Sequence, residues 1–348
     1  TAVADTTGVA SATDTTRTTI STTATGATGA ADTTRTTSVA AVFAGLLLAM
    51  FVSTLSETVT ATALPTIVGD LGGVGHMQWV TTAYILASTI MMPVYGKLGD
   101  LFGRKHLFIV ALSVFIVGSA TCGLAPSMDG LIAGRAVEGL GGGGLIILSQ
   151  ATIADIIPPR QRGKYMGVLG SVFAVSTVVG PLLGGWFVQV TGWRWLFAFN
   201  IPLALLAIAA VAFFSRRPAR RAKHPSVDVL GMMAMAVSVS SLVLATAWGG
   251  TLFPWLSWQI VGLFALFAAM AVVFALVERR AKEPVIPLFL FKNRNFVVCT
   301  VTGMFIMLGM MGTVSYLPTY FQIVDGLAPE QAGLMTFPMM AGVLLTAV

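Results

Sequence analysis

Charged residues are scarce in this 348-residue chain, at 10% of the sequence. Ordinary soluble domains carry roughly 25% charged residues and about 45–50% apolar ones. Apolar residues make up 56% of this chain. The shortage of charge excludes a soluble domain of ordinary composition and predicts an all-α membrane protein that crosses the bilayer several times.

Cysteine and histidine are also rare. The two cysteines, Cys122 and Cys299, lie far apart in apolar runs, and His76, His106 and His224 show no spacing typical of metal ligands. Such a pattern indicates neither a disulfide framework nor a metal site. We therefore expect structural roles for these five side chains, and no metal or cofactor.

The first 38 residues have no apolar run. They contain sixteen threonines, and residues 14–19 recur as residues 32–37. Such a segment buries too little apolar surface to offset the entropy lost on ordering, so we expect a disordered tail. It is not a signal peptide, because no apolar core precedes a small-residue cleavage site.

Long apolar runs fill the rest of the chain. About 20 apolar residues are needed for a helix to cross a bilayer. Ten runs of about this length cover residues 40–64, 77–96, 106–125, 130–154, 164–188, 194–214, 228–248, 256–277, 295–317 and 331–348. The tenth reaches Val348 without a polar flank, so we expect a fragment of a longer protein.

Basic residues fall on one side of this arrangement. If every run spans the membrane, 18 of the 20 lysines and arginines lie on the same side. Because basic residues favour cytoplasmic loops, the N-terminus is expected to be cytoplasmic. The net charge of +6 then reflects topology rather than binding to nucleic acid. The basic segment 215–227 is expected to be a cytoplasmic connector, with contact to anionic lipids as the alternative.

The segment 96–105 carries four charges and three glycines between two apolar runs. A charged loop there must lie at a bilayer surface. Asp100 and Arg104 are spaced to pair on a helix, and Asp155, at the same end of the fourth run, is a second candidate partner for Arg104. We expect a gating role for this set: Gly96, Gly99, Asp100, Gly103, Arg104, Lys105 and Asp155.

Three ionisable residues lie inside apolar runs. Glu57 is in the first run, and Arg135 and Glu138 lie one helical turn apart in the fourth, at a similar depth. Such groups cost at least about 2.5–3.5 kcal/mol each, so they usually face a cavity or a partner. A structural ion pair between the first and fourth helices would satisfy them. The alternative is a proton site in which Glu57 or Glu138 carries the proton and Arg135 responds to its charge.

Two groups of glycines lie inside apolar runs, one in the fourth run and one in the fifth. Gly139, Gly141 and Gly144 match the G-x-G-x-x-G spacing of a dinucleotide site, but no strand precedes them, so close helix packing is favoured. In the fifth run, a Gly-Pro pair and two further glycines predict a helix bend and a close approach by a neighbour. These residues are Gly180, Pro181, Gly184 and Gly185.

Several of these segments resemble the major facilitator superfamily. The charged segment 96–105 is similar to its signature loop between the second and third helices, Arg135 with the glycines at 139 and 141 to its fourth-helix motif, and residues 180–186 to its antiporter motif. Residues 63–67 (ALPTI), 193–202 (WRWLFAFNIP) and 316–322 (YLPTYFQ) resemble the 14-helix drug:proton antiporters.

The chain departs from these motifs at three positions. Ser56 stands where the first helix of that group commonly has aspartate, and Glu138 stands where the family usually has glutamine. Ser176 replaces a glycine that usually lies four residues before the Gly-Pro pair.

The resemblance implies a domain plan. After the tail at 1–38, it places a six-helix N-terminal bundle at 39–214, the connector at 215–227, and two inserted helices at 228–277. A cytoplasmic loop at 278–294 and the first two helices of a C-terminal bundle at 295–348 would complete the chain.

The resemblance also implies a function. We expect a plasma-membrane exporter of amphipathic drugs or antibiotics, driven by protons, and not an enzyme. Its expected partners are a small-molecule substrate, protons and membrane lipids, without nucleic acid, and we expect a monomer. An importer or facilitator of a polar solute is one alternative, and a membrane receptor without transport is another.

Overall fold

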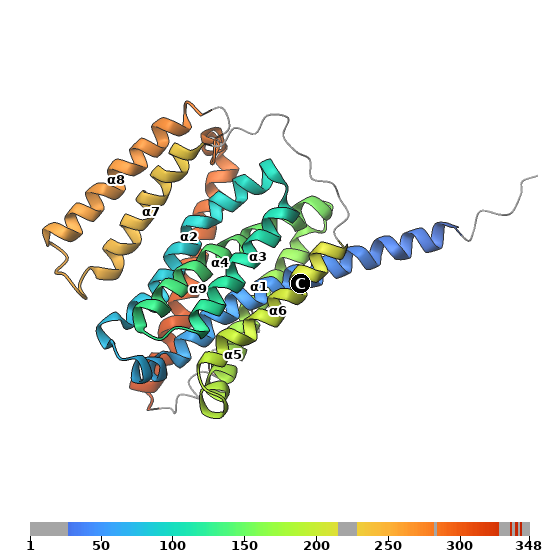
Figure 1. The fold of residues 1–348 in the computed structure, drawn as a ribbon. Coiled ribbons are helices and arrows are strands. Elements are labelled where there is room, and N and C mark those ends of the chain that lie inside the picture. Colours follow the sequence, from blue (N-terminus) through green and yellow to red (C-terminus); the bar gives the residue numbers. More distant parts are fainter. Residues whose placement is uncertain are drawn as a thin grey trace, which may run out of the picture.

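The computed structural model describes residues 27–214, 228–281 and 284–326, with residues 335, 338, 339 and 342. This part of the chain is helical apart from turns and an isolated bridge between Gly249 and Phe253 (Figure 1). Its α-helices are α1 (Ala27–Leu71), α2 (Met77–Phe102), α3 (Arg104–Gly123), α4 (Met128–Ile156), α5 (Arg162–Val190), α6 (Arg194–Phe214), α7 (Val229–Trp248), α8 (Trp258–Glu278) and α9 (Arg294–Ile323). Short 3₁₀ turns are η1 (Val74–His76) and η2 (Leu288–Lys292).

The expected apolar runs correspond to these helices in order. Runs one to nine correspond to α1 to α9, although runs three, seven and eight extend one or two residues beyond their helices. The tenth run lies mostly, and the basic segment 215–227 entirely, outside the described residues. Seven of the described helices, α1 and α3 to α8, are long and apolar enough to cross a membrane. The all-α, multi-span fold class predicted from the sequence is thereby confirmed.

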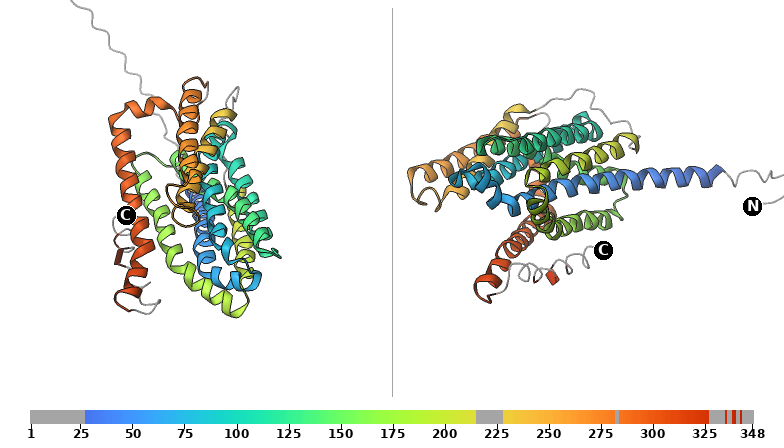
Figure 2. Two further views of the ribbon diagram at one scale, coloured as in Figure 1. Left: turned by 90° about the vertical axis from the view of Figure 1, so that its left-hand side faces the viewer. Right: turned by 60° about the horizontal axis from the view of Figure 1, so that its bottom comes forward.

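The tail differs in part from expectation. Disorder was expected up to residue 38, but α1 begins at Ala27, so residues 27–38 are helical, while residues 1–26 lie outside the described part. Extending an existing helix costs far less than starting one, and the apolar run that follows provides the start. The N-terminal end of α1 projects beyond the other helices (Figure 1; Figure 2, right).

The first six helices form a bundle around α1 and α4. α1 packs against α4, α5 and α6, α4 packs against α2 and α3, and α3 also packs against α6. The α7–α8 pair lies beside this bundle, with α7 against α2 (Figure 1). α9 packs on η2, and its side chains from Val298 to Gly309 are exposed.

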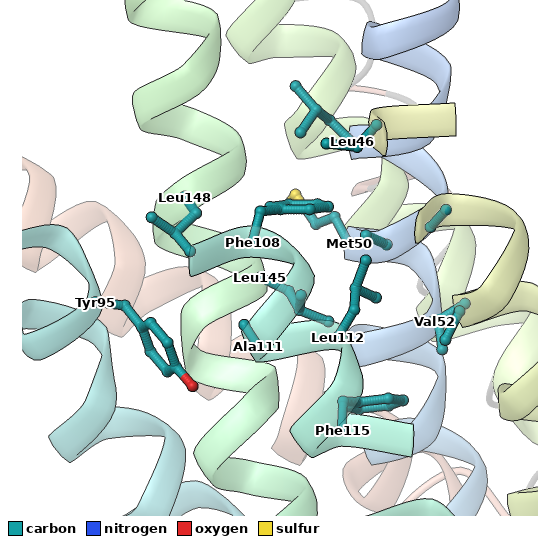
Figure 3. Packing of buried hydrophobic residues seen from close by; sticks show 14 of the residues in the cluster. Leu46, Met50, Val52, Tyr95, Phe108, Ala111, Leu112, Phe115, Leu145 and Leu148 are labelled. Atoms are coloured by element: carbon teal, nitrogen blue, oxygen red, sulfur yellow. The ribbon is translucent and has the colours of Figure 1, made fainter. Parts of the chain in front are cut away.

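Apolar side chains from α1, α3 and α4 fill the centre of the bundle (Figure 3). Leu46 of α1, Phe108 and Phe115 of α3, and Leu145 and Leu148 of α4 are each at most 1% exposed. Lipid tails are as apolar as these side chains, so the hydrophobic effect does not drive spanning helices together. Close packing of interdigitated side chains stabilises their association instead. This core fixes how α1 and α3 are rotated against α4, and so which of their polar residues face it.

The connection between α2 and α3 is shorter than expected. α2 continues to Phe102 and α3 starts at Arg104, so Gly103 alone breaks the helix, with φ of 95°. A residue with a Cβ is strained at that φ. The ten-residue charged loop predicted from the sequence is therefore wrong in form, because the glycines and charges before Gly103 belong to the last turns of α2.

Candidate functional site

A fully buried ion pair lies in the N-terminal half of α4. Arg135 Nη1 is 2.6 Å from Glu138 Oε2, and both side chains are 0% exposed. The spacing of three residues places both on one face of the helix. The predicted proximity of these two residues is confirmed.

Glu138 is held by groups from three other helices. Its Oε1 accepts hydrogen bonds from Ser56 Oγ of α1 at 2.8 Å and from Ser119 Oγ of α3 at 2.7 Å. Asn200 Nδ2 of α6 approaches the same oxygen at 3.4 Å. The carboxylate thus lies where α1, α3, α4 and α6 meet, with its position fixed from each side.

Arg135 reaches toward α2. Its Nε donates to the carbonyl oxygen of Val80 at 3.3 Å, and its Nη1 also donates to Ser56 Oγ at 3.1 Å. The guanidinium carbon lies 4.2 Å from the centre of the Tyr84 ring, in a cation–π contact. Its Nη2 is buried and has no hydrogen-bond partner in the structure as described. One strong donor of the guanidinium is therefore unused in this arrangement.

Glycines let the neighbouring backbones approach this pair. A Cβ at Gly139 would overlap the carbonyl oxygen of Tyr84, and one at Gly143 would overlap that of Ser88. On the other face, a Cβ at Gly141 would meet Ala111 O and Phe115 N of α3 at 2.5 Å. These contacts confirm the packing interpretation of the glycine run.

Glu57 lies near the pair, close enough to interact electrostatically with Arg135, but in the described structure it does not bond to it. Its side chain is half-buried, and among the described residues no hydrogen bond or ion pair joins it to Arg135. Its neighbour Ser56 faces Arg135 and Glu138 instead. One position along a helix turns a side chain by about 100°, so the depth predicted for Glu57 did not determine its face.

A second cluster surrounds Arg104 at the end of the bundle. Arg104 Nη2 lies 2.8 Å from Asp100 Oδ1, and Nη1 lies 2.9 Å from Asp155 Oδ2 and contacts the carbonyl oxygen of Ala151. Both predicted ion pairs are confirmed, and they join α2, α3 and the end of α4. Lys105 Nζ donates to the carbonyl oxygen of Ala212 in α6 at 2.6 Å.

The glycines near Arg104 differ in their contacts. A Cβ at Gly99 would lie 2.8 Å from Leu148 Cδ2, the end of a side chain that would have to shift. A Cβ at Gly96 would make only an ordinary contact, 3.6 Å from Ile147.

The Gly-Pro segment of α5 packs on α1. A Cβ at Gly180 would overlap Thr58 Oγ1, and one at Gly184 would lie 3.2 Å from Thr62 Cβ, whereas Gly185 has open space. Pro181 cannot donate its backbone hydrogen bond, yet α5 continues through it.

Hydroxyl groups reinforce this contact between α1 and α5. Thr58 Oγ1 donates to the carbonyl oxygen of Ser176 at 3.1 Å, and the hydroxyls of Thr54 and Ser176 lie 2.7 Å apart. Neighbouring hydroxyls commonly satisfy backbone groups near a proline in a spanning helix.

Several residues of the buried site were not predicted. Tyr84, Ser119 and Asn200 all contact the pair. An uncharged polar residue within an apolar run was their only sequence signal, and many other serines and threonines share it. Where residues are described, no cluster of three histidine, cysteine or acidic residues could hold a metal ion.

Comparison with known sequences gives one family. The family model described as "Major Facilitator Superfamily" matches residues 46–348. The chain is 40% identical over 308 residues to the multidrug transporter protein MdtP of Bacillus subtilis (strain 168), covering 88% of this chain and 57% of that protein. It is 38% identical to multidrug resistance protein 3 of the same organism, with 88% and 59% covered.

A fungal relative shows similar values. Efflux pump FUS6 of Gibberella fujikuroi (strain CBS 195.34 / IMI 58289 / NRRL A-6831) is 37% identical, with 86% of this chain and 55% of that protein covered. The chain thus spans about half the length of the curated relatives it matches.

Solved structures share the fold. The human organic anion transporter MFSD10 has a TM-score of 0.54 at 17% identity, covering 88% of this chain and 72% of that one. The proton:xylose symporter XylE has a TM-score of 0.55 at 14% identity, covering 90% and 68%.

Proposed function

Because the chain belongs to the major facilitator superfamily, we propose that it acts in transport rather than catalysis, as a proton-coupled exporter of amphipathic small molecules. Relatives named as multidrug transporters and efflux pumps support export of drug-like compounds. The basic bias of the loops supports a cytoplasmic N-terminus, and the plasma membrane is the proposed location. Alternating access would come from one bundle moving against the other.

The observation that carries the proton coupling is the buried Arg135–Glu138 pair. Both side chains are 0% exposed and lie in α4, which is long and apolar enough to cross a membrane. Protonation of Glu138 would neutralise the carboxylate and leave the arginine charge without its counterion. Such an imbalance in a buried site costs several kcal/mol, so proton binding must be accompanied by a movement of Arg135 or of another charge.

Glu57 is the proposed second acid in this step. It lies in α1, next to Ser56, which bonds both members of the pair. The buried Nη2 of Arg135, which has no partner in the described structure, gives the guanidinium a donor for it. When Glu138 takes up a proton, Arg135 would be released toward Glu57, and the helices that carry these residues would move together.

The departure from the family pattern is consistent with this role. The family resemblance places an aspartate at position 56 and a glutamine at position 138, whereas this chain has Ser56 and Glu138. Ser56 Oγ and Glu138 Oε1 are 2.8 Å apart. Compared with that pattern, the acid lies on α4 instead of α1, on the other side of the α1–α4 contact, and it is still beside Arg135.

The position of the acid, on α4 or on α1, provides the test. Purified protein in vesicles would be assayed for dye efflux with and without a pH gradient, and for substrate exchange without a gradient. Glu138→Gln should abolish the gradient-driven part while exchange continues. The double variant Ser56→Asp with Glu138→Gln, which returns the acid to α1, should restore it.

The control is Asp129→Asn, which removes an acid from the exposed start of α4, where the side chain is 83% exposed. It should leave gradient-driven efflux at the wild-type level. Undiminished gradient-driven efflux in Glu138→Gln would refute the proposed role of Glu138.

We assign the Arg104 cluster to the alternating-access step. Its two ion pairs tie α2 and α3 to the end of α4, so breaking and remaking them would bias which side of the bundle opens. The contact between Gly180 and Thr58 would similarly set how α5 moves on α1. Import of a polar solute is the competing function, since XylE, a symporter, shares the fold, and the vesicle assay also reports direction.

A further inference from the structure

A groove lies between the C-terminal end of α3 and the N-terminal end of α6, on the outside of the bundle. It has a volume of about 270 Å³ and is open on one side. Its lining includes Ala120, Gly123 and Leu124 of α3, and Arg194, Trp195 and Ala198 of α6. The small residues among them create the space, because α3 and α6 pack together elsewhere along their length.

The groove has the character of a membrane interface. It lies at the end of α3 and the start of α6, at the opposite end of α3 from the Arg104 cluster. Leu124 is 82% exposed and Trp195 is 58% exposed. Tryptophan is enriched at the headgroup level of bilayers, and an open apolar groove at that level faces lipid rather than water.

Arg194 provides charge at the mouth of the groove. Its Nη2 donates to the carbonyl oxygen of Ala125 at 3.2 Å, and its guanidinium carbon lies 4.3 Å from the centre of the Trp193 ring. These contacts hold the guanidinium in place. Asp70 of α1 accepts a hydrogen bond from Nε1 of the same Trp193 ring at 2.8 Å, but among the described residues no ion pair joins it to Arg194. Apart from Arg135, which is buried, Arg194 is the one basic residue that the sequence places away from the basic side.

From these features we propose that the groove binds an anionic glycerophospholipid, with its phosphate on Arg194 and an acyl chain along Ala120, Gly123 and Ala198. A zwitterionic lipid is disfavoured because its cationic headgroup would bring a second positive charge near the guanidinium. Arginine suits a phosphate because its planar donors can bind two oxygens at once. The apolar lining favours hydrocarbon over water, and the lipid bilayer supplies both parts of such a molecule.

The groove also adjoins the buried pair. Ser119 lines it and donates to Glu138 at 2.7 Å. A lipid chain in the groove would therefore exclude water from the α3–α6 side of the carboxylate. This consequence is separate from the binding itself, which does not depend on Glu138 carrying a proton.

Quenching of tryptophan fluorescence by brominated lipids tests the proposal. The purified protein would be placed in vesicles with increasing fractions of brominated phosphatidylglycerol or brominated phosphatidylcholine. The contribution of Trp195 is the difference between the wild type and Trp195→Phe. One favourable arginine contact with an anionic lipid predicts half-quenching of Trp195 at a roughly fivefold lower fraction of phosphatidylglycerol than of phosphatidylcholine.

Trp186 is the matched control. It is 54% exposed and lies near the end of α5, and the two lipids should quench its contribution equally. Arg194→Gln should remove the preference at Trp195, and Arg194→Lys should keep it. Ala198→Leu, which fills the groove, should weaken quenching of Trp195 by both lipids.

Two kinds of result would overturn the proposal. Equal quenching of Trp195 by both lipids, or a preference that survives Arg194→Gln, would mean ordinary surrounding lipid. The same preference at Trp186 would mean a general attraction of anionic lipid to this face.

Discussion

The chain uses the same pair of groups in two very different places. Arg135 and Glu138 are separated by 2.6 Å with both side chains 0% exposed, whereas Arg104 and Asp100 are separated by 2.8 Å with 22% and 60% exposed. The geometry is nearly equal, but the surroundings are not. An exposed pair is worth about 0–1 kcal/mol, and removing one partner of a buried pair costs about 3–5 kcal/mol.

This difference separates two roles. A pair that costs little to break can open and close in each transport cycle, as we propose for Arg104. A pair that is expensive to break can hold its state until a proton changes its charge, as we propose for Arg135 and Glu138. The same contrast gives tests ordered by the size of the expected effect.

Arg135→Gln should have the largest effect on stability. It leaves the Glu138 carboxylate buried without a counterion, so the free energy of unfolding should fall by about 3–5 kcal/mol. Arg104→Gln, the same substitution at the exposed cluster, should cost less than about 1 kcal/mol for each pair lost. Urea unfolding of both variants in the same detergent measures the difference.

A second substitution separates charge from packing. Adding Glu138→Gln to Arg135→Gln removes the lone carboxylate, so part of the lost stability should return. Equal losses for the two arginine variants, or no recovery in the double variant, would show that burial does not distinguish the two sites as described.

Gly143→Ala extends the contrast to the backbone around the buried pair. The added methyl group would overlap the carbonyl oxygen of Ser88, which lies in α2, and overpacking of this kind costs about 1–3 kcal/mol. Gly170→Ala is the matched control, because Gly170 lies in a helix with open space around it. There, alanine should be neutral or stabilise by about 0.4–1 kcal/mol. Thermal unfolding of the two variants tests this comparison. Similar shifts in their unfolding temperatures would contradict the close approach of α2 and α4.

The sequence predicted the helices and the exposed cluster well, for a physical reason. Apolar length determines which segments can span a bilayer, and Asp100, Arg104 and Asp155 lie at helix ends that topology brings to one surface. Two ion pairs at that surface followed from chain order alone. The glycine packing around α4 followed from the absence of a strand before it.

The buried site was predicted only in part. Counting residues from a helix end gave the depth of Glu57, but a single sequence does not give the rotation of a helix about its own axis. That rotation is set by packing in the apolar core, to which Leu46, Phe108 and Leu148 contribute (Figure 3). The structure consequently directs Ser56, not Glu57, at Arg135, and brings in Ser119 and Asn200 from helices whose facing sides the sequence did not reveal.

The smallest effects on stability are expected for the two carboxylates of the exposed cluster. Asp100→Asn and Asp155→Asn each remove one of the two ion pairs of Arg104, so each should lower the free energy of unfolding by less than about 1 kcal/mol. Both should nonetheless slow transport, because each loosens the tie between α3 and a neighbouring helix.

Efflux rates in vesicles measure this slowing of transport. Raising the salt concentration should slow the wild type toward the rates of the variants, since salt screens exposed pairs. The buried pair is screened much less, so the salt-sensitive part of the rate should disappear in the double variant Asp100→Asn with Asp155→Asn. Wild-type rates in both single variants would refute the gating role of this cluster and leave the buried pair and Glu57 as the charged elements of the proposed cycle.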